Sequence, residues 1–273
     1  MLRVLTWNIR TGGRDRGGAD RLDQVVRVVD EQAPDVLALQ ELRGFDRDGL
    51  MATVAGRVGM TPHLARSCLG QPVAVLVRPP YQVLDAGTLR RPFHHAAVRV
   101  VVATTAGPLT VLGTHLYPYS GGRRRMEADW LVRAVRRARG PLTVVTGDLN
   151  SLDPGVDHTE RLAGMPTRYR RRHLRRGGGD VDTRAIARLL DADLVDLWPS
   201  VNAAAAEAEG LTVPTRLGGA EFAGMRLDYL LGTHAVARRT RECRVIRGAT
   251  ADTASDHYPL LTTLDLGPAA TDT

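Results

Sequence analysis

The deciding stretch of this sequence is Pro141-Leu142-Thr143-Val144-Val145-Thr146-Gly147-Asp148-Leu149-Asn150-Ser151, an apolar, β-branched run that ends in one carboxylate and one carboxamide. Its composition predicts a buried strand that stops where the polar side chains begin. Residues two apart at a strand end project to the same side, so Asp148 and Asn150 can face one hard cation or one phosphate. Glycine before Asp-x-Asn is also ordinary turn chemistry, so the interpretation depends on polar residues elsewhere in the chain.

Three other apolar runs end in polar side chains in the same way. A strand is predicted over residues 2–9 with Asn8 at its end, and a second over residues 35–42 that delivers Glu41. A third predicted strand, over residues 109–116, carries His115 at its end. Each of these residues alone could be a turn former or a structural side chain. Their repetition at strand ends favours a shared site.

Two polar segments from the C-terminal part of the chain join this set. Asp228 lies within a predicted strand over residues 226–231, where an unpaired carboxylate is costly, so it needs a histidine or arginine partner. Asp256 and His257 open the last apolar strand. The sequence therefore offers His257 as the partner of Asp228.

Hydrophobic periodicity predicts the rest of the architecture. Helices are expected over residues 20–32, 50–58, 126–139 and 183–190, with further strands over 73–77, 81–84 and 96–104. The candidate polar residues span positions 8 to 257, so a shared site requires a single domain, which we place at residues 1–266. The tail, residues 267–273, has nothing to bury and is expected to be disordered.

The charge of the chain points to an anionic partner. The 273 residues carry a formal charge of +7, and all 37 basic residues are arginine. Arginine stays charged and binds phosphate in a bidentate way, which suits a phosphate-rich partner, although coding bias explains the same count equally well. The absence of lysine excludes Schiff-base chemistry by a side chain.

One segment concentrates this charge. Residues 168–176 hold six arginines, and we select Arg168, Tyr169, Arg171 and Arg172 as candidate substrate-binding residues. Arginines here could clamp a phosphate backbone while the tyrosine stacks on a base. The alternative is a mobile charged loop, which the following Gly177-Gly178-Gly179 favours.

The cysteine content and the N-terminal sequence bear on where the protein is located in the cell. Cys68 and Cys243 are too few for a disulfide framework or a zinc site. The first apolar run is too short for a signal peptide or a membrane span. We therefore expect a soluble, cytoplasmic protein without a membrane span and assume a monomer.

The motifs, taken in order, resemble the endonuclease/exonuclease/phosphatase superfamily, the metal-dependent phosphodiesterases related to pancreatic DNase I and exonuclease III. The matching motifs are Thr-Trp-Asn8, Leu-Gln-Glu41, Gly-Thr-His115-Leu, Gly-Asp148-Leu-Asn150, Arg-Leu-Asp228-Tyr and Ser-Asp256-His257. Each motif alone is weak, but their order over nearly the whole chain is specific. The resemblance implies a DNase I-like α/β fold, a four-layer α/β/β/α sandwich of two mostly antiparallel sheets flanked by helices.

The resemblance also implies roles for the site residues. Glu41 would bind Mg²⁺, or Mn²⁺ as a substitute, with Asn8 and Asp256 on the metal side; oxygen ligands suit these hard ions. Asp148 would orient or deprotonate the attacking water, and Asn150 would hold the phosphate. His257, held by Asp228, would contact a phosphate oxygen or handle the proton. His115 would help to protonate the leaving group.

The expected function is Mg²⁺-dependent hydrolysis of a phosphodiester, with nucleic acid as the favoured substrate. Hydrolysis of a small or lipid-linked phosphate is the alternative, because the same core suffices for it. A non-catalytic binding module on this fold is less consistent, since no core residue is missing. The chain has Asn8-Ile9-Arg10-Thr11 and Gln40-Glu41-Leu42-Arg43 where abasic-site endonucleases typically continue with Asn-x-Asn/Asp-Gly and Gln-Glu-Thr-Lys, so a general phosphodiesterase or phosphatase role is favoured over abasic-site repair.

Overall fold

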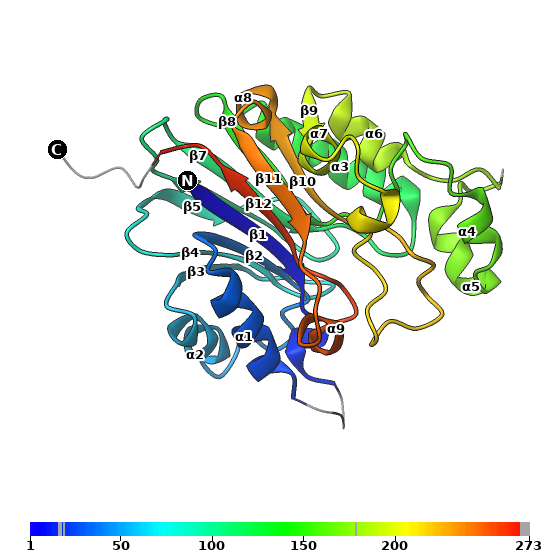
Figure 1. The fold of residues 1–273 in the computed structure, drawn as a ribbon, viewed down its shortest axis with the longest axis horizontal. Helices are drawn as coiled ribbons and strands as arrows, with labels where there is room; N and C mark the ends of the chain where they lie inside the picture. The colour runs from blue at the N-terminus through cyan, green and yellow to red at the C-terminus, as the bar shows by residue number, and fades with distance from the viewer. Residues whose placement is uncertain (16–17, 19, 178, 268–273) are drawn as a thin grey trace.

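The computed structural model describes residues 1–15, 18, 20–177 and 179–267, and its centre is a pair of six-stranded sheets packed face to face (Figure 1). The first sheet contains, in spatial order, β11 (Thr240–Val245), β12 (Leu260–Leu264), β1 (Leu2–Asn8), β2 (Val36–Gln40), β4 (Val73–Val77) and β3 (Thr61–Ala65). The second contains β5 (Val83–Thr88), β6 (Ala97–Val102), β7 (Leu109–His115), β8 (Leu142–Asp148), β10 (Asp228–Thr233) and β9 (Leu194–Asp196).

Both sheets are mostly antiparallel. The pairs β1–β2 and β7–β8 are parallel, and the other described strand pairs run antiparallel. The central strands read as near-continuous apolar runs because both of their faces are covered; all seven residues of β8 are buried.

Alternate side chains of each strand enter different cores. In β8, Leu142 and Val144 join the core between the two sheets, whereas Val145 points to the outer helices. In β1, Val4 faces the partner sheet and Trp7 faces the helices. This period of two explains why one sequence run serves two apolar layers.

Helices cover both outer faces of the sandwich (Figure 1). The first sheet is covered by α1 (Leu22–Gln32), α2 (Leu50–Arg57) and α9 (Ala251–Ala254), and the second by α3 (Gly121–Val135) and α6 (Arg184–Leu190). The connections contain η1 (Thr11–Gly13), α4 (Thr159–Ala163), α5 (Thr167–Arg170), η2 (Arg171–His173), α7 (Leu197–Val201), η3 (Glu207–Gly210) and α8 (His234–Ala237). The predicted four-layer α/β/β/α fold is confirmed.

Several elements differ from the sequence-based expectation. The strands β3 and β11 were not predicted, because both are edge strands whose sequences, Thr-Pro-His-Leu-Ala and Thr-Arg-Glu-Cys-Arg-Val, lack a buried apolar run. Helix α3 begins at Gly121 rather than at residue 126. A Cβ atom at Gly121 would lie 1.9 Å from Asp182 Oδ2, so a distant residue, not local propensity, favours glycine there. Of the expected disordered tail, residues 268–273 lie outside the described residues.

Gly147 is required by close packing of β8 against β7 and not by a turn. Its φ is +138°, and a Cβ atom there would lie 1.8 Å from the carbonyl oxygen of Thr114. We expect Gly147→Ala to lower the free energy of unfolding by about 3 kcal/mol or more, through strain and overpacking. Urea unfolding measures this, with Gly87→Ala in β5 as the control, since no atom lies within 4 Å of a Cβ there. Equal stability of the two variants would contradict this explanation of Gly147.

Candidate active site

Strand register places the polar ends of five strands together. In the second sheet His115 of β7 pairs with Asp148 of β8, and Asp148 pairs in turn with Asp228 of β10. In the first sheet Asn8 of β1 lies opposite Gln40 of β2, so Glu41 is the next residue beyond the pair. The two sheets face each other at these strand ends. Chain segments that are far apart in sequence therefore contribute to one buried polar cluster.

Asp148 occupies the centre of the cluster. Its Oδ2 atom accepts a hydrogen bond from Asn8 Nδ2 at 3.0 Å and lies 3.3 Å from His115 Nε2 and 3.7 Å from His257 Nε2. Its Oδ1 atom accepts from the backbone N–H of Asn150 at 2.9 Å. Burial raises the pKa of Asp148 above its ordinary value, although the two histidines act in the opposite direction. Asp148 is therefore a carboxylate suited to accept a proton.

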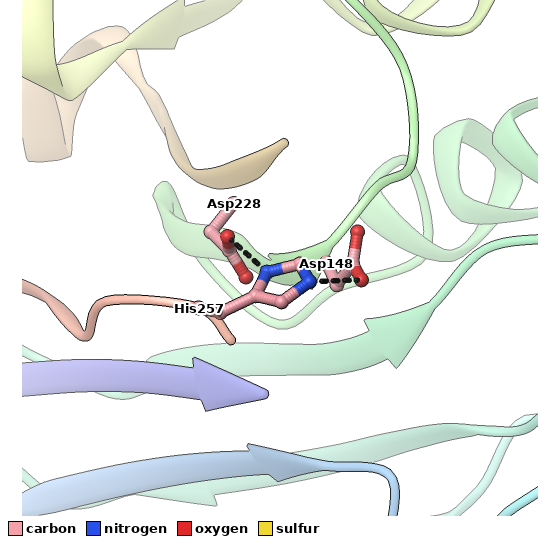
Figure 2. A group of neighbouring side chains, drawn as sticks. All are labelled: Asp148, Asp228 and His257. Carbon is pink, nitrogen blue, oxygen red and sulfur yellow. Dashed lines mark hydrogen bonds and ion pairs between the residues drawn. The ribbon is translucent and has the colours of Figure 1, made fainter. Parts of the chain in front are cut away.

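Asp228 and His257 form a buried pair (Figure 2). His257 Nδ1 lies 2.8 Å from Asp228 Oδ2, and its Nε2 edge is turned toward Asp148. Trp7 Nε1 donates to the carbonyl oxygen of His257 at 2.8 Å, which fixes the backbone. Burial lowers the pKa of His257, but the charges of Asp228 and Asp148 outweigh it and raise the pKa to about 10. The two carboxylates therefore favour the protonated form of the ring.

Glu41 follows β2 in a left-handed backbone conformation, with φ of +58°. Its carboxylate accepts hydrogen bonds from Asn8 Nδ2 at 3.2 Å, the Thr11 backbone N–H at 2.9 Å and Gln71 Nε2 at 3.0 Å. Burial alone would raise the pKa of Glu41, but the neighbouring His115 and the hydrogen bonds from Thr11 and Asn8 lower it. A positive φ costs free energy for a non-glycine residue, and such conformations persist where the surroundings enforce them. Glu41 is therefore a fixed, ionised carboxylate.

Asn8 connects the two central carboxylates. Its Nδ2 group donates to both Glu41 and Asp148, and its Oδ1 atom accepts from the Arg10 backbone N–H at 3.0 Å. Asn8 was predicted for the metal side. In the structure its amide group holds the carboxylates of Glu41 and Asp148 in place.

Asp256 supplies a further carboxylate on the side of Glu41. Its Oδ2 atom lies 3.8 Å from Arg10 Nε, and its Oδ1 atom accepts from Ser255 Oγ at 3.3 Å. Burial raises the pKa of Asp256, and the negative charge of Glu41 raises it further. A divalent cation would relieve the repulsion that Glu41 exerts on the charge of Asp256, so these oxygen donors fit Mg²⁺ or Mn²⁺.

A second grouping with metal-ligand atoms is better explained by hydrogen bonding. Ligand atoms of Asp148, Asp228 and His257 all lie within 4.8 Å of one another (Figure 2). The 2.8 Å contact between His257 Nδ1 and Asp228 Oδ2 requires a proton between them, because a carboxylate oxygen can only accept a hydrogen bond. This contact favours a hydrogen-bonding role for the group.

Asn150 and His115 complete the predicted set. Asn150 has φ of +49°, and its Nδ2 group donates to the carbonyl oxygen of Leu116 at 3.1 Å, which fixes its side chain beside His115. The structure therefore brings together Asn8, Glu41, His115, Asp148, Asn150, Asp228, Asp256 and His257, all eight residues predicted for catalysis and metal binding.

Residues 5–257 match the family described as "Endonuclease/Exonuclease/phosphatase family". The chain belongs to this family of phosphoester hydrolases. Similar solved structures are an AP endonuclease from Archaeoglobus fulgidus (21% identity, TM-score 0.73, covering 97% of this chain and 100% of the other) and the 3' phosphatase NExo from Neisseria bound to a product DNA hairpin (19%, 0.71, 97% and 100%). Truncated TDP2 from Caenorhabditis elegans is also similar (18%, 0.67, 96% and 96%). No curated protein sequence matches the chain.

The arginine-rich segment of this family member is folded, which disagrees with the mobile-loop alternative. Arg168 and Tyr169 lie in α5, and Arg171 and Arg172 lie in η2. The guanidinium of Arg172 lies over the rings of Tyr119, at 5.1 Å, and Tyr169, at 4.8 Å; Arg168 lies over Tyr169 at 4.5 Å. These are cation–π contacts that order the segment. Gly178, part of the glycine run used for the mobility argument, lies outside the described residues.

A buried arginine joins this segment to the active-site strand. Arg124 of α3 is fully buried; its Nη2 group donates to the carbonyl oxygen of Arg172 at 2.7 Å and its Nη1 group to that of Tyr117 at 3.2 Å. Tyr117 follows His115 by two residues. Burial lowers the pKa of Arg124 to about 10, so the group still carries its charge at neutral pH. The segment is therefore tied to the chain that leaves the catalytic end of β7.

Two residues at the site were missed by sequence reasoning. Gln71 donates to Glu41, and His95 stacks on His115. Both lie in connections without a recognisable motif, so only the packing of the chain reveals them. No helix in the described part of the chain is long and apolar enough to cross a membrane.

Proposed function

We propose that this protein hydrolyses phosphodiester bonds in nucleic acid with the help of a divalent cation, Mg²⁺ or, as a substitute, Mn²⁺. The observation that carries the proposal is that Asn8 joins Glu41, whose charge acts on Asp256, to the Asp148–His257–Asp228 chain of hydrogen bonds and charges. The first group suits a hard cation and the second suits proton transfer. Phosphodiester hydrolysis needs both.

The metal-side residues have distinct tasks. Glu41 and Asp256 would hold the cation, and Asn8 would keep Glu41 and Asp148 at a fixed separation through its two hydrogen bonds. The bound ion would supply charge neutralisation for the non-bridging phosphate oxygens. Because Glu41 is already held by three donors, the protein does not have to reorganise it when substrate binds.

The proton-handling residues act around Asp148. Asp148 would orient the attacking water and accept its proton, which its raised pKa favours. His257, charged through its pairing with Asp228, would donate a hydrogen bond to a phosphate oxygen and stabilise the charge that develops there. His115 would deliver a proton to the leaving oxygen, and Asn150 would hold the phosphate.

A basic hollow next to α3 favours a substrate with several phosphates. It has a volume of about 790 Å³, and its lining includes Arg123, Arg171, Arg175, Arg176 and Arg184. Its acidic lining residue, Asp182, accepts a hydrogen bond from Arg184 Nε at 2.9 Å. Arg123 is paired with Glu127 at 3.5 Å, so Arg171, Arg175 and Arg176 are the lining arginines left to attract a polyanion.

Tyr119 connects this hollow to the catalytic cluster. It lines the basic hollow and also a second hollow, of about 580 Å³, that contains Gln71 beside Glu41. Tyr119 is 56% exposed, so the part of its ring that Arg172 does not cover is accessible for stacking on a base. Of the four predicted substrate-binding residues, Arg171 lines the basic hollow, whereas Arg168, Tyr169 and Arg172 contact one another or Tyr119. We propose that a nucleic-acid strand crosses both hollows over Tyr119.

Conversion of supercoiled plasmid to nicked circles in the presence of Mg²⁺ tests the proposed function. We expect nicking that stops with EDTA and is lost in His257→Ala. A folded sample that leaves the plasmid intact but hydrolyses a small phosphodiester or a phosphomonoester would overturn the nucleic-acid assignment in favour of a small or lipid-linked phosphate substrate.

The arginines of the basic hollow provide a separate prediction. We expect the triple replacement Arg171→Ser, Arg175→Ser and Arg176→Ser to raise KM for DNA and to reduce the salt dependence of log KM by about 2 to 3, since each lost phosphate contact removes about 0.7 to 0.9 of the slope. The matched control replaces Arg133, Arg136 and Arg137 on the exposed face of α3 and its C-terminal end. The same slope in both triple variants would exclude a specific role of the hollow.

A further inference from the structure

The two active-site histidines are held in different ways. His257 has a carboxylate on Nδ1, which fixes the orientation of its ring. His115 is 2% exposed, and its buried Nδ1 atom has no hydrogen-bond partner in the described part of the chain. A buried ring with one unpartnered nitrogen is not oriented by hydrogen bonding alone. Some other contact must fix the plane of His115.

His95 provides that contact. Its ring stacks on the ring of His115 with centroids 3.9 Å apart and an angle of 5° between the planes. His95 is itself 6% exposed and precedes β6 by two residues. A parallel stack at this distance blocks rotation of the His115 ring out of its plane. The in-plane contact of His115 is its Nε2 atom, 3.3 Å from Asp148 Oδ2.

The loop before β4 fixes His95 in turn. The backbone N–H of Gln71 donates to His95 Nδ1 at 2.9 Å, which places the proton of the neutral ring on Nε2. Gly70 lies against the same ring, and a Cβ atom there would lie 2.5 Å from His95 Nδ1. Ser67 Oγ donates to the carbonyl oxygen of His94 at 2.9 Å and ties the two segments together.

Gln71 also links this stack to the metal side. While its backbone N–H holds His95, its side-chain Nε2 donates to Glu41 Oε2 at 3.0 Å. One residue therefore fixes the position of Glu41 and, through His95, the plane of His115. The two halves of the site cannot shift independently without breaking one of these contacts.

We propose that His95 is a positioning residue that holds the His115 ring, through stacking, in the orientation needed to protonate the leaving oxygen. The inference rests on the proposed function. In the reaction, the water oxygen bonds to phosphorus as the bond to the leaving oxygen breaks. One water proton passes to Asp148, and the leaving oxygen takes a proton from His115. His95 lines the hollow of about 580 Å³, but in this scheme its effect on the reacting atoms passes through His115.

This role predicts an effect that depends on the leaving group. A poor leaving group, such as an alkoxide, needs protonation, whereas p-nitrophenolate departs without it. His95→Ala should therefore lower kcat by about 10- to 100-fold for an alkyl ester of thymidine 5'-phosphate, the range seen when an orienting partner is lost. The loss should be within about threefold for the p-nitrophenyl ester, and KM should change little for either substrate, because the lost interaction acts in the transition state.

Two further variants make the test specific. His95→Phe keeps an aromatic ring over His115 but cannot accept from Gln71, so we expect it to retain most of the activity lost in His95→Ala. His94→Ala is the neighbouring control, since His94 meets His95 and Tyr117 edge to face and does not stack on His115. Thermal unfolding of each variant reports whether the fold is kept.

The outcomes separate this inference from the proposed function. Equal losses for the two leaving groups in His95→Ala, or a phenylalanine variant as impaired as the alanine variant, would overturn the positioning role. If the wild-type protein with Mg²⁺ hydrolyses neither ester, the proposed phosphodiesterase function fails as well. If it hydrolyses both and His95→Ala leaves their ratio unchanged, only the role of His95 fails.

Discussion

Glu41→Gln should reduce Mg²⁺-dependent phosphodiester hydrolysis by about 10³-fold or more, equivalent to about 4 kcal/mol of transition-state stabilisation. The replacement keeps the shape of the side chain but removes the negative charge of the carboxylate that is proposed to hold the cation. An amide can still accept from Thr11 and Gln71, so the local fold should persist. The loss should therefore come from cation binding and not from unfolding.

Titration with Mn²⁺, followed by electron paramagnetic resonance, measures the cation directly in the wild-type protein and the variant. Glu242→Gln is the matched control, because Glu242 lies on the exposed edge strand β11 and pairs with Arg244. Unchanged Mn²⁺ affinity in Glu41→Gln would place the cation elsewhere. Retained hydrolysis would contradict the assignment of Glu41.

Asp228→Asn should lower kcat by about 10²- to 10³-fold, because loss of a carboxylate that orients and charges a catalytic histidine is costly in other hydrolases. The raised pKa of His257, about 10, depends on the charge of Asp228 as well as that of Asp148. In the variant the pKa should fall toward the ordinary value of 6.5. At neutral pH a large fraction of the rings would then lose the proton that His257 offers to phosphate.

Asp228→Asn should also change how the stability of the protein depends on pH. Because the folded pKa of His257 exceeds the unfolded value, its contribution is fully present below pH 6.5 and is lost as the pH rises through about 10. The stability difference between wild type and Asp228→Asn should therefore be largest below pH 6.5 and should shrink toward pH 10. Urea unfolding over this range, without added divalent cation, measures it. A difference that grows with pH would show that His257 is not charged by Asp228.

Much of the site was predictable because polar residues at strand ends leave a local signature. Asn8, Glu41, His115 and Asp148 each follow an apolar run, and the pairing of β1 with β2 and of β7 with β8 then brings them together. The need of buried Asp228 for a partner follows from the cost of an isolated buried charge. These arguments use only short-range sequence and elementary electrostatics.

What escaped prediction depends on contacts between distant segments. The order of the arginine-rich segment comes from Arg124, whose burial is not evident in the sequence Arg123-Arg124-Arg125. The stack of His95 on His115 needs the pairing of β6 with β7, and its support by Gln71 needs the loop before β4. Edge strands β3 and β11 lack a continuous apolar pattern because most of their side chains are partly or fully exposed.

Hydrolysis of bis(p-nitrophenyl) phosphate with Mg²⁺ tests the central claim most directly, because this small diester needs the catalytic cluster but none of the arginines of the basic hollow. The site described here predicts release of p-nitrophenol by the wild-type protein that is abolished by EDTA and reduced by about 10³-fold in both Glu41→Gln and His257→Ala. Release that persists in EDTA, or that is unchanged in either folded variant, would contradict a cation-assisted phosphodiesterase built from these residues.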